Sequence, residues 1–280
     1  MREGIRDETV SVETEKRKVL EKAEKLLVLA FSEVLPPEEA TRRALKIRET
    51  KILTPTEFRK MRKKGSLDYD SEGFLEIDIN QRGIVSRRAV VKRRSSQVSF
   101  LSTVLHEGIH LMSPDGNLIA GSNFSQNPED WNFSSFLGAV RYERGRKTKA
   151  VDPLSIYENP RGRALFWEGA TDSLASEILS PSLTPRQRKQ LEKEGYVLEK
   201  IYFQFLADRV PDREEFIKKI KEAYVKGEED IFRWYLHEIT GRQDDSFYDE
   251  LLDIFKMPNE EWETKIEKLM AAVDRLWPKK

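Results

Sequence analysis

Two histidines stand four residues apart, in a chain that has only three histidines among its 280 residues. They are His106 and His110, and Glu107 directly follows the first of them. On an α-helix, positions i and i+4 lie one turn apart on the same face, so both imidazoles can face one ion. Neutral imidazole nitrogen is a common ligand of Zn²⁺, and a glutamate roughly 100° further round the helix can reach a bound water without binding the ion. The spacing therefore predicts two zinc ligands, His106 and His110, and one general base, Glu107.

These residues need a helix to position them, and the residues around them have a helical pattern. Ser95 or Ser96 can cap the start of this helix, and residues 113–116 (Ser-Pro-Asp-Gly) can end it. The apolar side chains that recur at helical spacing are Val98, Leu101, Val104, Leu105, Ile109 and Met112. We therefore expect a largely buried helix. Two buried imidazoles need a partner for their nitrogens, and a metal ion is the natural one.

A catalytic zinc takes three protein ligands and keeps a fourth position for water. The third ligand is neither a cysteine nor a histidine close after the motif. The chain has no cysteine, and Ser113 and Gly116 stand three and six residues after the second histidine. We therefore expect a carboxylate from a second helix, and Glu168 is the best candidate. Its segment, 159–179, begins with Asn-Pro, continues with apolar residues at helical spacing and stops at Ser-Pro. Poorer alternatives for the same role are Glu177, Glu129 and Asp130.

Glu168 and Asp172 are again four residues apart, so their carboxylates lie on one helical face. Asp172 can accept the free ring N–H of a ligand histidine, which fixes the tautomer of that ring and raises its basicity. Gly108 and Gly169 lie beside the two motifs. Glycine inside a helix costs about 1 kcal/mol relative to alanine, so we expect these two to let the helices cross closely at the metal.

An HExxH motif, followed on a second helix by an ExxxD motif, resembles the gluzincins, the thermolysin-like clan of zinc metallopeptidases. The resemblance covers the two motifs and the stretch between them. It implies that His106, His110 and Glu168 bind one catalytic zinc, that Glu107 is the general base and that Asp172 is the partner of His106. The implied reaction is hydrolysis of a peptide bond through a zinc-bound water that Glu107 activates. The Gly-x-Met-Glu-Asn motif of the aminopeptidase branch is absent, which favours an endopeptidase.

Thermolysin-like enzymes also place a histidine or tyrosine from the C-terminal lobe near the zinc, where it donates a hydrogen bond to the oxyanion. The resemblance implies such a residue here. His237 is the first candidate, and Tyr202 and Tyr196 are the alternatives. The other interpretation of His237, a half-buried helical histidine bonded to a neighbour, stays open.

The pattern predicts an α+β, mostly helical protein: a zincin-like catalytic core with a small N-terminal sheet and a helical C-terminal lobe. We expect a helical region over 1–70, the core over 71–183, and a lobe over 184–280 that packs as one unit with the core. Apolar residues alternate with polar ones over 74–80, which predicts a strand, and 84–92 can form its partner. We expect 74–80 to be an edge strand that pairs with an extended substrate.

The rest of the chain adds elements around this core. Helices are expected to end before the Pro36-Pro37 pair, to run over 37–49, and to start near Thr54-Pro55. Residues 138–144 can form a further strand, and the irregular residues 117–150 are expected to line the site. From Thr184 onward the pattern predicts five or six helices.

Composition excludes several functional classes. The net charge is zero, so we expect neither nucleic acid nor membrane as a partner. The partner that the resemblance implies is a peptide or protein substrate. No apolar run approaches the ~20 residues of a membrane span, no signal-peptide core precedes the first helix, and cysteine is absent, so we expect a cytoplasmic protein. Charged residues make up 35% of the chain, which favours a thermophile. One basic run is expected to be a solvated face: Arg82, Arg87, Arg88, Lys92, Arg93 and Arg94.

A second function fits the same motifs: a non-catalytic or latent zinc-binding protein whose helical lobe mediates protein interaction. Glu107 argues against it, because a structural zinc site needs no base and is usually closed by a fourth protein ligand.

Overall fold

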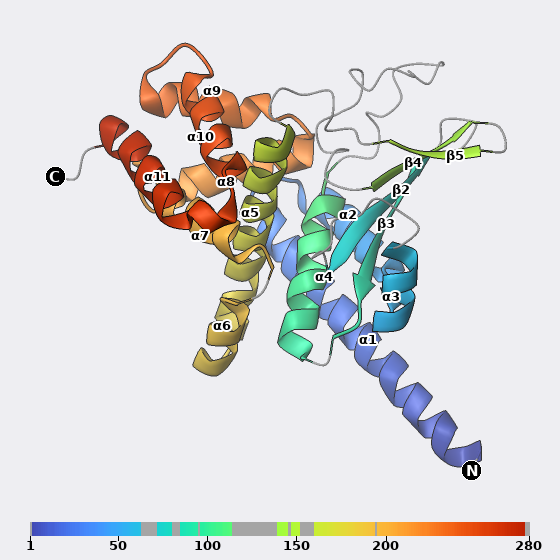
Figure 1. Cartoon of the computed structure of the whole chain (residues 1–280). Helices are drawn as coiled ribbons and strands as arrows, with labels where there is room; N and C mark the ends of the chain where they lie inside the picture. The colour runs from blue at the N-terminus through green and yellow to red at the C-terminus, as the bar shows by residue number, and fades with distance from the viewer. Residues whose placement is uncertain are drawn as a thin grey trace.

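The computed structural model describes residues 2–62, 72–79, 85–94, 96–113, 139–144, 147–151, 160–193 and 195–277. Within these ranges the protein is mostly helical with one small sheet, as the sequence predicts, and the sheet has five strands (Figure 1). Ser95, the alternative ligands Glu129 and Asp130, and most of the 117–150 segment lie outside the described residues.

The N-terminal helices follow the prolines and caps of the sequence. Helix α1 spans Arg2–Phe31 and ends before the Pro36-Pro37 pair, as expected. Helix α2 spans Pro37–Ala44, and the expected continuation to residue 49 is a 3-10 helix, η1, over Leu45–Glu49. Helix α3 spans Pro55–Arg62, where the Thr54 hydroxyl accepts a hydrogen bond from the Glu57 backbone N–H.

The sheet has the strand order β1-β3-β2-β4-β5. Its strands are β1 (Lys51–Leu53), β2 (Gly73–Ile79), β3 (Val85–Lys92), β4 (Ala139–Arg144) and β5 (Lys147–Val151). The strands expected over 74–80, 84–92 and 138–144 are present; β1 and β5 were not anticipated. The expectation that 74–80 is an edge strand is wrong, because β2 pairs antiparallel with β3 on one side and parallel with β4 on the other. The pairing with β3 covers Gly73–Ile79, and the pairing with β4 covers residues 76–79.

The two faces of the sheet pack against different partners, because successive side chains of a strand point to opposite faces. Leu75, Ala89 and Val91 join the main core, which also holds the buried side of helix α4. Phe74 and Val90 join a smaller cluster with Leu53 and Phe58, the latter from α3. The sheet therefore supports α4 from one side.

Helix α4 spans Gln97–Leu111 and contains both histidines of the HExxH motif. Ser96 caps it by accepting a hydrogen bond from the backbone N–H of Ser99. Helix α5 spans Pro160–Leu179 and ends where the Ser-Pro pair predicts. In Figure 1, α5 lies between α4 on one side and the C-terminal helices on the other. The HExxH and ExxxD helices are thus neighbours in the middle of the molecule.

Within residues 180–193 and 195–277, six α-helices follow α5, in agreement with the expected five or six. After η6 (Ser180–Ser182) come α6 (Pro185–Leu191), α7 (Val197–Ala207), α8 (Arg213–Lys226), α9 (Asp230–Thr240), α10 (Ser246–Lys256), η7 (Asn259–Glu261) and α11 (Trp262–Leu276). Phe166 of α5 packs its ring against aromatic rings of α7, α9 and α10. One continuous buried core runs from Val19 to Val273. Among the described residues, no helix is both long enough and apolar enough to span a membrane.

Candidate metal site

Three side chains of α4 and α5 converge on one point. Nε2 of His106 and Nε2 of His110 are 3.2 Å apart. The Glu168 carboxylate lies beside both rings, 2.9 Å from Nε2 of His106 and 3.8 Å from Nε2 of His110. One ligand atom from each residue lies within 4.8 Å of the other two. The structure therefore brings together the three donors that the sequence motifs predict.

The spacing of these atoms suits a small divalent ion. Bonds of about 2.0–2.2 Å in a tetrahedron place two ligand atoms about 3.3–3.6 Å apart, and the separations of 2.9, 3.2 and 3.8 Å bracket this value. Two imidazoles and one carboxylate favour zinc or a similar transition metal over Ca²⁺ or Mg²⁺, which prefer oxygen ligands. This His106–His110–Glu168 group can thus hold a metal ion.

Burial and the interactions between neighbouring groups shift the pKa values of all three donor residues. Burial is the largest influence on the pKa of His106 and lowers it, but the Asp172 and Glu168 carboxylates outweigh it and raise that pKa well above its usual value. For Glu168, burial raises the pKa, while hydrogen bonds from both histidines outweigh it and lower the pKa below its usual value. Burial lowers the pKa of His110, which favours its neutral, ligating form. Such a buried cluster of perturbed groups is typical of functional sites.

Glu107 lies outside this donor group but is buried beside it, with 4% of its surface exposed. The pKa of its carboxyl is raised to about 8, mainly by burial; His106 opposes this rise, and the neighbouring Glu168 and Asp172 charges add to it. The carboxyl packs against the backbone of Gly73 at the start of β2. A Cβ at that glycine would lie 2.6 Å from Oε1 and 2.9 Å from Cγ of Glu107. Glycine at 73 therefore leaves the space that the Glu107 side chain occupies.

Asp172 links the donor group to the C-terminal helices. Its Oδ1 accepts a hydrogen bond of 2.6 Å from Nδ1 of His106, which leaves Nε2 of that ring free to bind a metal. Its Oδ2 accepts a hydrogen bond from the backbone N–H of Tyr196, just before α7. The Tyr196 ring also stacks on the His106 ring, with centroids 6.3 Å apart and planes 22° apart. The partnership of Asp172 with His106 is thus present in the structure.

His110 is held mainly through its helix end. Its Nδ1 is buried and has no hydrogen-bond partner among the described residues. Its backbone carbonyl, however, accepts a hydrogen bond of 2.6 Å from Arg87 of β3, which also bonds the carbonyl and hydroxyl of Ser113. The expectation that the whole basic run of the sequence is a solvated face is wrong at Arg87, because this side chain is buried and caps α4.

Tyr224 of α8 was not anticipated near the site. Its ring centroid lies 6.1 Å from that of His110. Its hydroxyl donates a hydrogen bond of 3.0 Å to the Trp167 carbonyl and is also hydrogen-bonded to Thr171. Burial raises the pKa of Tyr224 well above its usual value. Tyr224 is more than 50 residues from both motifs in the sequence, so no short motif predicts its contact with the site. The contact arises because α8 packs beside α4 and α5.

The two helical glycines serve a different contact from the one expected. A Cβ at Gly108 would lie 2.7 Å from Cδ1 of Leu27, so this glycine admits α1. A Cβ at Gly169 would lie 2.7 Å from the backbone oxygen of Glu199, so this one admits α7. The interpretation that both glycines let α4 and α5 cross at the metal is therefore wrong. They let other helices approach α4 and α5.

The remaining candidates lie at different places. Glu177, an alternative ligand, is ion-paired with Arg213. His237 lies in α9, where its Nε2 pairs with Oδ1 of Asp245 at 2.9 Å, and the structure does not bring it into the three-donor group. Tyr202 is fully buried under the amino group of Lys265, which lies 4.8 Å from its ring centroid. Of the three proposed oxyanion donors, Tyr196 alone is described in contact with a donor of the metal group.

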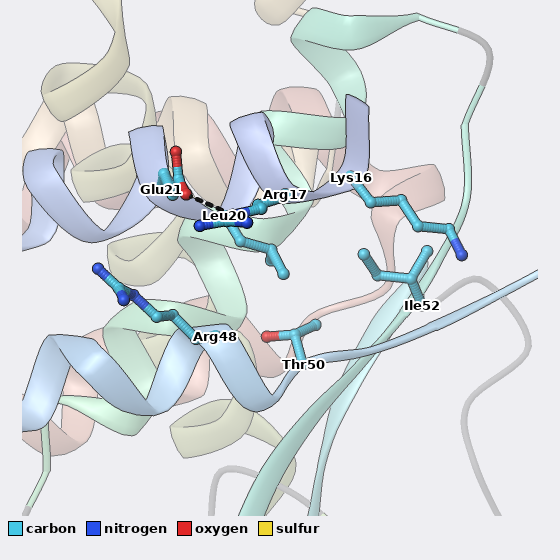
Figure 2. Close-up of a pocket in the computed structure, with 7 residues that line it drawn as sticks. All are labelled: Lys16, Arg17, Leu20, Glu21, Arg48, Thr50 and Ile52. Carbon is cyan, nitrogen blue, oxygen red and sulfur yellow. Dashed lines mark hydrogen bonds and ion pairs between the residues drawn. The ribbon is translucent and has the colours of Figure 1, made fainter. Parts of the chain in front are cut away.

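A hollow of about 580 Å³ lies elsewhere, between α1, η1 and β1 (Figure 2). Its lining includes three cationic side chains, Lys16, Arg17 and Arg48. Arg17 is paired with Glu21, and Arg48 is paired with Glu24. The hollow contains none of the metal-site residues, so we assign it no part in the chemistry described below.

Comparisons of the chain with protein-family models, with characterised proteins and with solved structures give no match. The functional argument therefore rests on the residues and geometry of the site.

Proposed function

We propose that the protein is a zinc-dependent metallopeptidase that hydrolyses peptide bonds within a chain, with a site of the gluzincin type. One observation carries the proposal: two imidazoles of α4 and one carboxylate of α5 converge, while Glu107 is buried beside them and outside their donor group. Three ligands of this kind leave a fourth position for water, as catalytic zinc sites do. A purely structural site has no use for this additional buried carboxylate, which is not a ligand.

Each residue has a defined part in the proposed reaction. His106, His110 and Glu168 hold the zinc, which when bound acts as a Lewis acid and lowers the pKa of a water molecule towards ~7. Glu107 accepts the proton of the attacking water and then passes it to the leaving amine nitrogen. Asp172 holds His106 in the tautomer that exposes Nε2. The same groups thus serve binding, orientation and proton transfer.

The donor that stabilises the oxyanion is best sought at Tyr196. Its ring lies against His106, whereas His237 is paired with Asp245 and Tyr202 lies under Lys265. A donor next to a ligand is in reach of charge that develops at the metal. The proposal therefore moves this role from His237, the first choice on sequence grounds, to Tyr196.

The first experiment separates metal binding from catalysis. Purified protein is loaded with zinc, its metal content is measured, and a peptide library is digested with and without chelator. In the Glu107→Gln variant we expect about one equivalent of zinc and a loss of hydrolysis of about 10²- to 10⁴-fold, because a positioned base contributes that much. In the Glu168→Ala variant we expect zinc content well below one equivalent.

The outcomes discriminate between functions. Hydrolysis at the wild-type rate by the Glu107→Gln variant would remove the assignment of the base. Full zinc binding with no cleavage by the wild-type protein would favour the non-catalytic or latent alternative. Glu177→Ala is the matched control on the same helix, because Glu177 is engaged with Arg213 and should leave the zinc content unchanged.

A further inference from the structure

The turn that precedes α7 contacts the metal site at three points, although it belongs to neither motif. The backbone N–H of Tyr196 donates to Oδ2 of Asp172, and the Tyr196 ring stacks on His106. The residue before it, Gly195, has a φ of +74° and lies against the Asp172 carboxylate. All three contacts are made with the Asp172–His106 pair.

Gly195 is required at this turn for two separate reasons. A positive φ of this size is a conformation that side-chain-bearing residues rarely adopt. In addition, a Cβ at position 195 would lie 2.7 Å from Cγ and 2.8 Å from Oδ1 of Asp172, closer than atoms can approach. Oδ1 is the atom that accepts the hydrogen bond from His106. Any side chain at 195 would thus displace the carboxylate that orients a ligand.

We infer that Gly195 and Tyr196 are positioning residues of the metal site, through which the C-terminal helices set the affinity of the site for zinc. The inference rests on the proposed zinc site. Asp172 can orient His106 only if its own carboxylate is held, and the Tyr196 N–H holds the oxygen that His106 does not use. Partners of this kind change metal affinity by about 10- to 100-fold when they are lost.

The experiment compares two glycines that share the same backbone strain. Gly241, which ends α9, has a φ of +67°, but a Cβ there would meet nothing within 4 Å. Gly195→Ala and Gly241→Ala are titrated with Zn²⁺ against a chromophoric chelator, and their Co²⁺ complexes are compared by visible absorption. We expect Gly195→Ala to bind Zn²⁺ about 10- to 100-fold more weakly than the wild type and to change the Co²⁺ spectrum, because His106 is reoriented. Gly241→Ala should retain the wild-type Kd and spectrum.

A third variant separates the ring from the backbone donor. Tyr196→Ala keeps the N–H to Asp172 and removes the stacked ring, so we expect its loss of Zn²⁺ affinity to be smaller than that of Gly195→Ala. Equal Zn²⁺ affinity for Gly195→Ala and wild type would overturn the inference and leave the zinc site intact. Equal loss for Gly195→Ala and Gly241→Ala would also overturn it, since strain alone would explain the effect. Failure of the wild-type protein to bind Zn²⁺ would instead refute the proposed function.

Discussion

Glu107, the proposed general base, has a raised pKa and a defined position beside Gly73. Burial raises the pKa of its carboxyl to about 8 in the metal-free protein, and a bound cation would favour the charged form. Its position is set by Gly73, which comes from the sheet rather than from the helix that carries the base. Gly73 and Glu107, the proposed general base, are thus 34 positions apart in the chain.

The first prediction concerns Gly73→Ala. The added Cβ would displace the Glu107 carboxylate. Because this carboxylate is the end of a flexible side chain, we expect little loss of stability. We expect kcat to fall at least tenfold, because displacements of about 1 Å at a catalytic group can cost 10²-fold in rate. Steady-state kinetics and zinc content are the measurements. Zinc content should remain at one equivalent. A variant with unchanged kcat would show that the position of Glu107 at Gly73 is not needed for turnover.

At the scale of elements, the C-terminal end of α4 is held by two buried arginines. Arg87 of β3 bonds the His110 and Ser113 carbonyls, and Arg43 of α2 bonds the Met112 carbonyl. The last carbonyls of a helix have no partner within the helix and carry its negative dipole end. The two guanidinium groups donate hydrogen bonds to these carbonyls and place positive charge at the negative end of the dipole. They also hold the turn of α4 that carries His110, whose Nδ1 has no partner among the described residues.

We predict that Arg87→Met destabilises the protein by about 2–4 kcal/mol, because buried carbonyls that lose their partner cost about 1–3 kcal/mol each. Urea unfolding of the metal-free protein measures the change. Lys92→Met on the same strand is the control: its ion pair with Glu72 is about one-third exposed on both sides, so its loss should change stability by no more than ~0.5 kcal/mol. Similar losses for the two variants would show that Arg87 is no more than a surface charge.

At the scale of the whole molecule, Arg43 joins three regions that are remote in sequence. One of its Nη atoms donates to the carbonyls of Met112 at the end of α4 and of Val225 in α8, each at 2.6 Å, while its Nε donates to Glu39. The N-terminal helices, the metal helix and the C-terminal helices therefore meet at one side chain. This agrees with a continuous core from α1 to α11. The boundaries expected at residues 70 and 183 stay predictions.

The pH dependence of this junction follows from Glu39. Hydrogen bonds from Arg42 and Arg43 lower the pKa of Glu39 from 4.5 to about 2. Because the folded state binds this proton less readily than the unfolded state, the stabilisation is complete above pH 4.5 and disappears as pH falls towards 2.

We therefore predict that Glu39→Gln lowers the free energy of unfolding at pH 7 by about 0.5–1 kcal/mol, the range for a partly exposed ion pair. The difference from the wild type should shrink when urea unfolding is repeated at pH 5, 4 and 3. Glu38→Gln, an exposed neighbour in the same turn, should change stability little at any of these values. A difference for Glu39→Gln that grows on acidification would contradict the assignment.

Local signals in the chain were sufficient for most elements. The Ser95-Ser96 pair correctly predicts the start of α4, and Pro160 and Pro181 correctly predict the two ends of α5, because caps and proline act within one or two turns. Alternation correctly predicts β2 and β3. The sheet edge was wrongly predicted, because whether a strand has a second neighbour depends on β4, which follows more than 60 residues later in the numbering. Pairing between remote strands leaves no mark on the strand itself.

The grouping of the reactive side chains follows from local spacing: two histidines, and a glutamate and an aspartate, stand at i and i+4, so the helical repeat places each pair on one face. The residues that surround these pairs follow from the packing of remote elements. Gly73, Arg87, Gly195 and Tyr224 come from two strands, a turn and a helix that no periodicity relates to the motifs. Helical periodicity relates residues a few positions apart, whereas the residues around the site are brought there by close packing of elements that are remote in sequence.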